Sequence, residues 1–88
     1  MSRVTIYTNI YCVYCNAAKA LLGKKGLEYR EVDLSSEPDL RLRLVEKYRW
    51  RTIPLILIGD KVIGGFAELY ELENTGELDR LLENELLD

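Results

Sequence analysis

The sequence predicts a single α/β domain built on a four-stranded mixed sheet with helices on both faces. Strand-like segments alternate with segments whose apolar residues follow a helical period, in the order β-α-β-α-β-β-α-α. A chain of 88 residues is too short for two independent cores, so we expect residues 1–88 to form one domain. A ferredoxin-like α+β fold is the alternative, but it requires a β-α-β-β start and no helix between the second and third strands.

The first strand and the first helix are predicted by a change in period. Residues 3–8, RVTIYT, are rich in β-branched and aromatic residues, which is typical of a strand. From Tyr14 the apolar positions follow the spacing of one helix face. These positions are Tyr14, Ala17, Ala18, Leu21 and Leu22. Gly23 and Gly26 indicate where this helix ends.

The next two elements continue the alternation. Residues 28–34, EYREVDL, predict a second strand. The stretch SSEPD, residues 35–39, predicts the start of a second helix, where Ser36 can cap the helix and Pro38 suits its first turn. Because strands joined through helices pair in parallel, we expect the first two strands to be parallel.

The second half predicts a hairpin followed by two helices. Residues 54–59, PLILIG, form a continuous apolar run, which favours a strand buried on both faces. A turn at 59–60 and a short strand at 62–63 follow. A third helix starts at Phe66 and stops near residues 74–76. The face of a last helix is formed by Leu78, Leu81, Leu82 and Leu86.

The charge and the absence of targeting signals exclude several classes of protein. The formal net charge is −3, which argues against nucleic-acid binding because that function needs a basic patch. No apolar run is long enough to span a membrane. The first eight residues enter a strand-like pattern without a signal peptide, so we expect a cytoplasmic protein. Separately, we expect the protein to be a monomer.

Cys12 and Cys15 are the only cysteines, and they lie where the first strand passes into the first helix. A cysteine at a helix N-terminus faces unpaired N–H groups and the positive end of the helix dipole, and both favour the thiolate. Thiolate is the attacking species in thiol–disulfide exchange. One helical turn separates the two residues, so a Cα separation of ~5 to 6 Å is expected, within the disulfide range. The pair therefore predicts a redox centre in which Cys12 attacks and Cys15 resolves.

Two other interpretations of the pair remain. The cysteines could be small buried hydrophobic residues, an interpretation that fits a single cysteine better than a C-x-x-C pair. They could also supply half of a tetrahedral metal site. The chain has no third cysteine and no histidine, so the other ligands would come from a second chain or a small thiol.

Two further motifs are compatible with a ligand site beside the cysteines. Pro54 precedes a buried strand; a cis Ile53–Pro54 bond would turn the Ile53 backbone outward, where it could pair with an extended ligand. A plain proline at the start of a strand fits equally well. Gly64 and Gly65 permit close backbone approach, and the helix that starts at Phe66 offers free N–H groups to a carboxylate. A simple turn from hairpin to helix explains them as well.

Together these motifs resemble the glutaredoxins: VTIYT, CVYC, AKALL, TIP and the double glycine occur in family order over nearly the whole chain. The resemblance implies a thioredoxin-like fold with a cis Pro54. It implies glutathione as co-substrate and reductant, with no tightly bound cofactor and no metal, and disulfide-bearing proteins as partners. Cys12 would be the nucleophile and Cys15 the resolving thiol. The implied glutathione site consists of Tyr14, Arg51, Thr52, Ile53, Pro54, Gly65, Phe66 and Ala67.

Several positions depart from the family pattern. Val13 replaces the proline of the usual C-P-Y-C motif, and Asn9 stands where a lysine is common. Ala67 and Glu68 stand where two acidic residues commonly follow the double glycine. Arg51 is the best remaining clamp for a carboxylate of glutathione, although a solvated arginine fits nearly as well.

Residues outside the main motifs carry smaller predictions. Tyr14 lies on the apolar stripe of its helix, which favours core packing over ligand contact. Trp50 ends the second predicted helix, where it could be a half-buried terminus or an aromatic that docks a partner.

Two alternative functions remain. The C-V-x-C motif also occurs in redoxins that take electrons from thioredoxin reductase and pass them to ribonucleotide reductase, although the SGF-R-P block of that branch is missing here. The second alternative is a dimeric thiol module that binds a metal or an iron–sulfur cluster.

Overall fold

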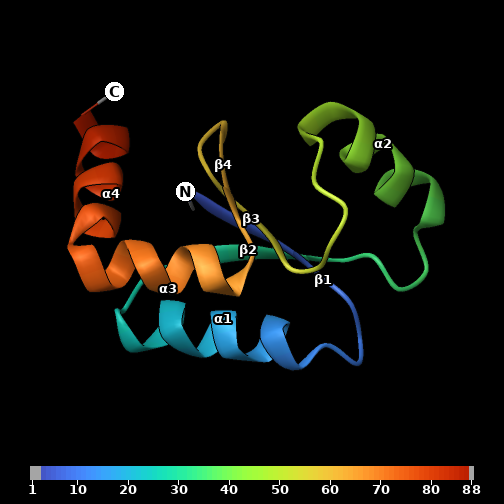
Figure 1. Ribbon diagram of the computed structural model, residues 1–88, viewed down its shortest axis with the longest axis horizontal. Coiled ribbons are helices and arrows are strands. Elements are labelled where there is room, and N and C mark those ends of the chain that lie inside the picture. The colour runs from blue at the N-terminus through green and yellow to red at the C-terminus, as the bar shows by residue number, and fades with distance from the viewer. Residues whose placement is uncertain (1–2, 88) are drawn as a thin grey trace.

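The computed structural model describes residues 3–87, with side chains through residue 83. Its elements follow the predicted order β-α-β-α-β-β-α-α, so the predicted α/β class is confirmed (Figure 1). The strands are β1 (Val4–Thr8), β2 (Tyr29–Asp33), β3 (Leu55–Ile58) and β4 (Lys61–Gly64). The helices are α1 (Val13–Lys24), α2 (Pro38–Tyr48), α3 (Phe66–Thr75) and α4 (Glu77–Leu87). Leu86, expected on the face of the last helix, lies outside the described side chains.

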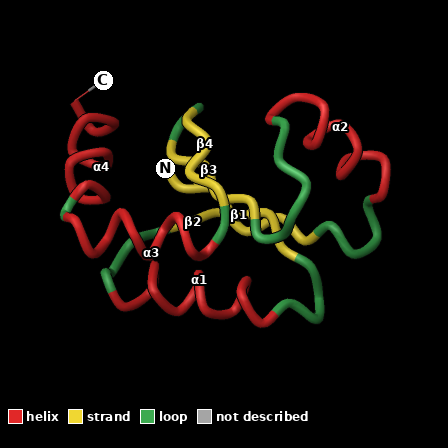
Figure 2. Tube along the Cα trace, in the orientation of Figure 1, coloured by secondary structure: helices red, strands yellow, loops and turns green. Residues whose placement is uncertain are grey.

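The four strands form one mixed sheet in the order β2-β1-β3-β4, which lies between the helices (Figure 2). β1 is parallel to β2, as predicted, and antiparallel to β3, while β3 and β4 form the expected antiparallel hairpin. The register pairs Tyr7, near the end of β1, with Leu55, at the start of β3. As a result, the loop that leaves β1 and the loop that enters β3 meet at the same end of the sheet.

One face of the sheet is covered by α1, α3 and α4. The strands present alternate side chains to this face, as their period of two requires. Its buried core is formed by Val4, Ile6, Ala18, Leu22, Ile56, Ile58, Leu69 and Leu78. The other face is covered by α2, which Figure 1 shows apart from the remaining helices. Its core is formed by Leu34, Leu44, Leu55 and Leu57. Burial on both faces explains why β3 is a continuous apolar run.

The start of α2 differs from the prediction. Glu37, and not Ser36, is the N-cap residue, and its side chain makes no capping hydrogen bond. Pro38 occupies the first turn as predicted. The helix begins one residue later than a Ser36 cap would require, because the proline itself sets the first helical position. At the other end, Arg49 adopts the left-handed conformation with φ of 60°.

Lys25 joins three helices at the end of the sheet away from the cysteines. It follows α1, and its Nζ lies 2.8 Å from Glu73 Oε1 on α3 and 2.9 Å from Asp79 Oδ1 on α4. The hydrogen bonds that the Lys25 ammonium donates to Glu73 and then to Asp79 raise the pKa of Lys25 above its ordinary value. Among residues 3–87, no helix has the length and apolar character of a membrane span.

Candidate active site

The two cysteines lie at the start of α1 and form a disulfide. Cys12 is the N-cap residue, with extended backbone angles, and Cys15 lies in the first turn. Their Cα atoms are 5.1 Å apart, within the predicted range. The backbone N–H of Cys15 donates to Cys12 Sγ at 3.0 Å, so the cap of this helix is a sulfur atom. A backbone N–H group of the first turn thus faces the Cys12 sulfur, which is the arrangement that favours a thiolate at a helix start.

The two sulfur atoms differ in accessibility. Cys15 is only 1% exposed, whereas Cys12 is partly exposed. An external thiol or disulfide can therefore reach Cys12 and not Cys15. This difference separates a sulfur that can exchange with a substrate from one that can act only within the protein.

The loop that enters β3 lies against the pair. Cys12 Sγ is 3.8 Å from the carbonyl oxygen of Ile53, although 41 positions separate the two residues. The Ile53–Pro54 peptide bond is cis, as the resemblance implied. The antiparallel pairing of β1 with β3 produces this contact, because it brings the two loops to one end of the sheet.

A groove of about 480 Å³ opens beside Ile53; we call it the proximal groove. It is lined by Tyr14, Trp50, Thr52, Ile53, Pro54, Gly65, Phe66, Ala67 and Glu68. The structure thus brings together seven of the eight residues predicted for glutathione. Arg51 is the exception, since it lines a narrow space beside α2 instead.

Trp50 forms part of the groove wall and packs against the double glycine. A Cβ atom added to Gly64 would lie 2.9 Å from Cη2 of the indole, and one added to Gly65 would lie 3.6 Å from Cζ2. Gly64 also has φ of 118°, which L side chains rarely adopt. The glycine at position 64 is therefore required by the indole and by the backbone. The indole Nε1 is buried without a hydrogen-bond partner in the described part of the chain.

Tyr14 is exposed, so the core packing predicted from the apolar stripe is wrong for this residue. Its side chain is 64% exposed and stacks on Phe66, with 6.3 Å between ring centroids. Phe66 in turn lies 5.7 Å from Tyr70. The Tyr14 ring lies beside α3 in the wall of the groove and not among the side chains that pack against the core. The three rings form an aromatic row that leads away from the cysteines along α3.

The start of α3 is already partly occupied by an acidic side chain. Glu68 Oε1 accepts a hydrogen bond from the backbone N–H of Gly65 at 2.9 Å. The N–H groups of Phe66 and Ala67 belong to the first turn, where a helix supplies no acceptor of its own. A ligand carboxylate could bind these two groups, in the presence of the negative charge of Glu68.

Asn9 faces the loop between β2 and α2. Its Oδ1 accepts hydrogen bonds from the N–H of Ile10 at 2.8 Å and from the Ser35 hydroxyl at 2.6 Å. Ser35 Oγ also accepts from the N–H of Ile10 at 2.9 Å. Hydrogen bonds from the Ser35 side chain and then its backbone lower the pKa of Asp33. Asn9 thus braces the loop that carries Cys12, in the place where the family often has a cation.

The cations near the site have separate environments. Lys19 on α1 forms an ion pair with Glu31 on β2 at 3.1 Å, so it is directed toward the sheet edge. The same Glu31 oxygen accepts a hydrogen bond from the buried hydroxyl of Thr8 at 2.8 Å. Arg51 is exposed and makes no ion pair within the described residues.

Comparison with known proteins decides the family. The glutaredoxin family model matches residues 4–63, which is more than half of the chain. The chain belongs to the glutaredoxin family. It is 43% identical over 82 residues to a glutaredoxin from Pseudomonas aeruginosa, an alignment that covers 93% of this chain and 98% of the relative.

Two solved glutaredoxins have the same fold. The holo form of glutaredoxin C1 from Populus tremula x tremuloides aligns with a TM-score of 0.87 and 33% identity, over 96% of this chain and 86% of that one. The buckwheat glutaredoxin–glutathione complex aligns with a TM-score of 0.87 and 29% identity, over 94% and 78%. The thioredoxin-like fold is confirmed, and this glutaredoxin is a thiol–disulfide oxidoreductase.

Two groove residues of this glutaredoxin were not in the predicted set. Trp50 was considered only as a helix end or a docking aromatic, and Glu68 only as a departure from the family pattern. A signal for Trp50 was available in the sequence. The bulky side chain four positions before Pro54 can fit against the double glycine elsewhere in the chain, because glycines leave room for it. That signal becomes specific only when the fold brings the two segments together. Among the described residues, no group of three or more acidic or cysteine side chains gathers as a metal site would require.

Proposed function

We propose that this glutaredoxin reduces mixed disulfides of glutathione and disulfides in proteins, with glutathione as the reductant. The observation that carries the proposal is the unequal burial of the two sulfur atoms beside the proximal groove. Cys12 is reachable from solvent, while Cys15 is buried within one helical turn of it. The structural similarity to a glutaredoxin bound to glutathione supports the same ligand here.

The chemistry follows from this arrangement. The Cys12 thiolate attacks the glutathione sulfur of a mixed disulfide, a Cys12–glutathione disulfide forms, and the substrate leaves as a thiolate. A second glutathione thiolate attacks the glutathione sulfur of that intermediate, which releases oxidised glutathione and restores the Cys12 thiolate. With a protein disulfide, Cys12 becomes linked to one substrate sulfur. Cys15 then attacks Cys12, so that the Cys12–Cys15 disulfide forms and the reduced substrate leaves. Two molecules of glutathione reduce that disulfide.

The proximal groove provides a seat for glutathione. Thr52 and Ile53 line the groove, and their backbone can pair with the extended tripeptide, as in strand addition. The rings of Tyr14 and Phe66 form an apolar wall. The N–H groups of Phe66 and Ala67 are available to a carboxylate. We propose that Arg51, though outside the groove wall, reaches the second carboxylate through its flexible side chain.

A coupled assay of NADPH oxidation tests the proposal. One arm supplies glutathione and glutathione reductase, and the other supplies thioredoxin reductase, with the same small mixed disulfide as substrate. We expect turnover in the first arm only. Turnover in the second arm alone would replace glutathione by thioredoxin reductase as the electron donor.

The two cysteines are tested separately. Cys12→Ser should abolish all reduction. Cys15→Ser should retain reduction of glutathione mixed disulfides, because glutathione itself resolves the intermediate, and should lose reduction of protein disulfides that require both thiols. The opposite pattern would show that the two roles are assigned the wrong way round.

The alternative functions are not favoured. The family match and the relatives are glutaredoxins, and no specific feature of the site supports delivery of electrons from thioredoxin reductase to ribonucleotide reductase. Within the part of the chain that the structure describes, no cluster of metal-ligating side chains supports the metal-binding alternative. We propose that glutathione acts as a co-substrate that leaves after each turnover.

A further inference from the structure

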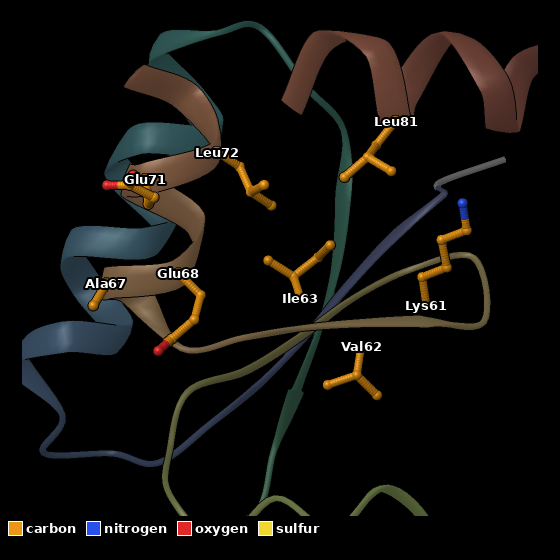
Figure 3. A pocket seen from close by; sticks show the side chains of 8 residues that line it. All are labelled: Lys61, Val62, Ile63, Ala67, Glu68, Glu71, Leu72 and Leu81. Atoms are coloured by element: carbon orange, nitrogen blue, oxygen red, sulfur yellow. The ribbon is translucent and has the colours of Figure 1, made fainter. Parts of the chain in front are cut away.

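A second groove lies between the β3–β4 hairpin and helices α3 and α4; we call it the distal groove (Figure 3). Its volume is about 560 Å³, within the range of ligand-binding pockets. It is lined by Lys61, Val62, Ile63, Ala67, Glu68, Glu71, Leu72 and Leu81. None of the residues from 61 to 63, 71, 72 or 81 takes part in the proximal groove.

The distal groove adjoins the proximal groove. Ala67 and Glu68, in the first turn of α3, line both. A chain that leaves the proximal groove past these two residues therefore arrives at the distal groove. Two adjoining grooves can hold a longer chain than the tripeptide alone.

The charges of the distal groove are polarised. Figure 3 shows Glu68 and Glu71 on α3 at one end, with the Glu71 carboxylate turned outward at the rim, and Lys61 on the hairpin at the opposite end. Ile63, Leu72 and Leu81 lie between them. Glu71 and Lys61 are both exposed, and neither forms an ion pair within the described part of the chain.

This pattern defines a complementary occupant. Apolar side chains would cover the middle of the groove, a basic side chain would pair with Glu71, and an acidic side chain would pair with Lys61. β4 is the outer strand of the sheet, so an extended chain can also pair with its free edge. A small apolar molecule would fill the middle and leave both charges unpaired.

We infer that the distal groove binds an extended segment of the disulfide substrate, with a basic residue toward the cysteines, apolar residues next and an acidic residue farthest away. The inference rests on the proposed function for the source of the segment. It adds a determinant of protein-substrate choice that acts outside the glutathione site. The charge order gives the bound segment a direction.

Two peptides test the direction. Each carries a glutathionylated cysteine, a Gly-Ser spacer and then either Lys-Leu-Val-Leu-Glu or the reversed segment Glu-Leu-Val-Leu-Lys. The first peptide can form ion pairs with both Glu71 and Lys61, whereas the reversed peptide can form neither. The KM of the first peptide should therefore be about three- to tenfold lower than that of the reversed peptide. A third peptide that ends at the spacer reports the chemistry without the segment. Equal KM values for all three peptides would overturn the inference while leaving the proposed function intact.

A charge-swapped variant sharpens the test. The double variant Glu71→Lys/Lys61→Glu keeps the net charge and should prefer the reversed peptide. The matched control Glu46→Lys/Lys47→Glu makes the same exchange on exposed positions of α2, on the other face of the sheet, and should keep the original preference. Preference lost equally in both double variants would show that the overall charge distribution, and not this groove, discriminates.

Binding without chemistry separates this inference from the proposed function. The first peptide with its cysteine replaced by serine should shift the backbone amide resonances of Ile63, Leu72 and Leu81, whether or not the enzyme uses glutathione. Absence of these shifts would overturn the inference even if every mixed disulfide is reduced. Sedimentation of the protein alone should show a monomer. A dimer that the charge-swapped variant dissociates would identify a second copy, and not a substrate, as the occupant.

Discussion

Replacing Gly64 by alanine is expected to destabilise the fold strongly, because two separate costs fall on one methyl group. The backbone at φ of 118° is unfavourable for an L residue, at about 1 to 3 kcal/mol. The new Cβ would also lie 2.9 Å from Trp50 Cη2 and 3.0 Å from Glu68 Cγ. Overpacking of this kind costs a further ~1 to 3 kcal/mol. The sum is about 2 to 6 kcal/mol, a large fraction of the stability of a small domain.

Urea denaturation followed by far-UV circular dichroism measures this effect. With an m value of about 1 to 2 kcal/mol per M for a chain of this size, the midpoint of Gly64→Ala should fall by about 1 M or more. Gly65→Ala should cost much less, because Gly65 has φ of −102° and its nearest contact would be the flexible carboxylate of Glu68 at 3.3 Å.

Gly23→Ala is the matched control, with the same added methyl group. Gly23 lies in α1, and an added Cβ would meet nothing within 4 Å. A helical alanine is favoured over glycine by about 0.5 to 1 kcal/mol, so this variant should be more stable than the parent. In a Trp50→Leu background, the steric part of the Gly64→Ala cost should shrink. Equal midpoints for the substitutions at 64 and 65 would refute the assignment of this glycine to the indole and the backbone.

Three further predictions concern charge and backbone conformation. Arg51→Ala should raise the KM for a glutathione mixed disulfide about fivefold, corresponding to ~1 kcal/mol for an exposed clamp, and leave a small neutral disulfide unaffected; an equal loss with both substrates would contradict a role toward the ligand. Lys25→Met should lower the free energy of unfolding at pH 7 by about 1 kcal/mol, since the ion pairs with Glu73 and Asp79 are lost. Because the folded-state pKa of Lys25 is raised, this contribution is fully present below the unfolded-state pKa near 10.5 and is lost as the pH rises through the folded-state value. The difference in stability between Lys25→Met and the parent should therefore narrow in urea titrations at alkaline pH. A difference that stays constant with pH would contradict the ion pairs as its cause. Arg49→Gly should raise the free energy of unfolding by about 0.5 to 1 kcal/mol and so raise the urea midpoint, because glycine adopts φ of 60° without the steric cost that arginine bears. An unchanged midpoint would show that Arg49 makes compensating contacts.

Local chemistry allowed much of this protein to be predicted from its sequence. Helical and strand periods depend on neighbouring residues only, so the order of the eight elements and most of their boundaries were predictable. The spacing of Cys12 and Cys15 within one helical turn determines their separation, which is 5.1 Å as a turn requires. The capping of α2 was less predictable, because Ser36 and Glu37 both precede Pro38 and the choice between them depends on the incoming loop.

The tertiary structure decided what surrounds the sulfur atoms. The antiparallel pairing of β1 with β3 brings the Ile53 carbonyl to 3.8 Å from Cys12 Sγ, a contact that spans nearly half of the chain. The pairing of β3 with β4 sets Gly64 opposite Ile56 and so brings it against Trp50, which precedes β3. The period of α1 placed Tyr14 on the apolar face but could not show that its ring lies beside Phe66 in the groove wall and outside the core. Periodicity describes the direction of a side chain from its own element, whereas exposure and contact depend on where other elements lie, and only the packed sheet and helices determine that.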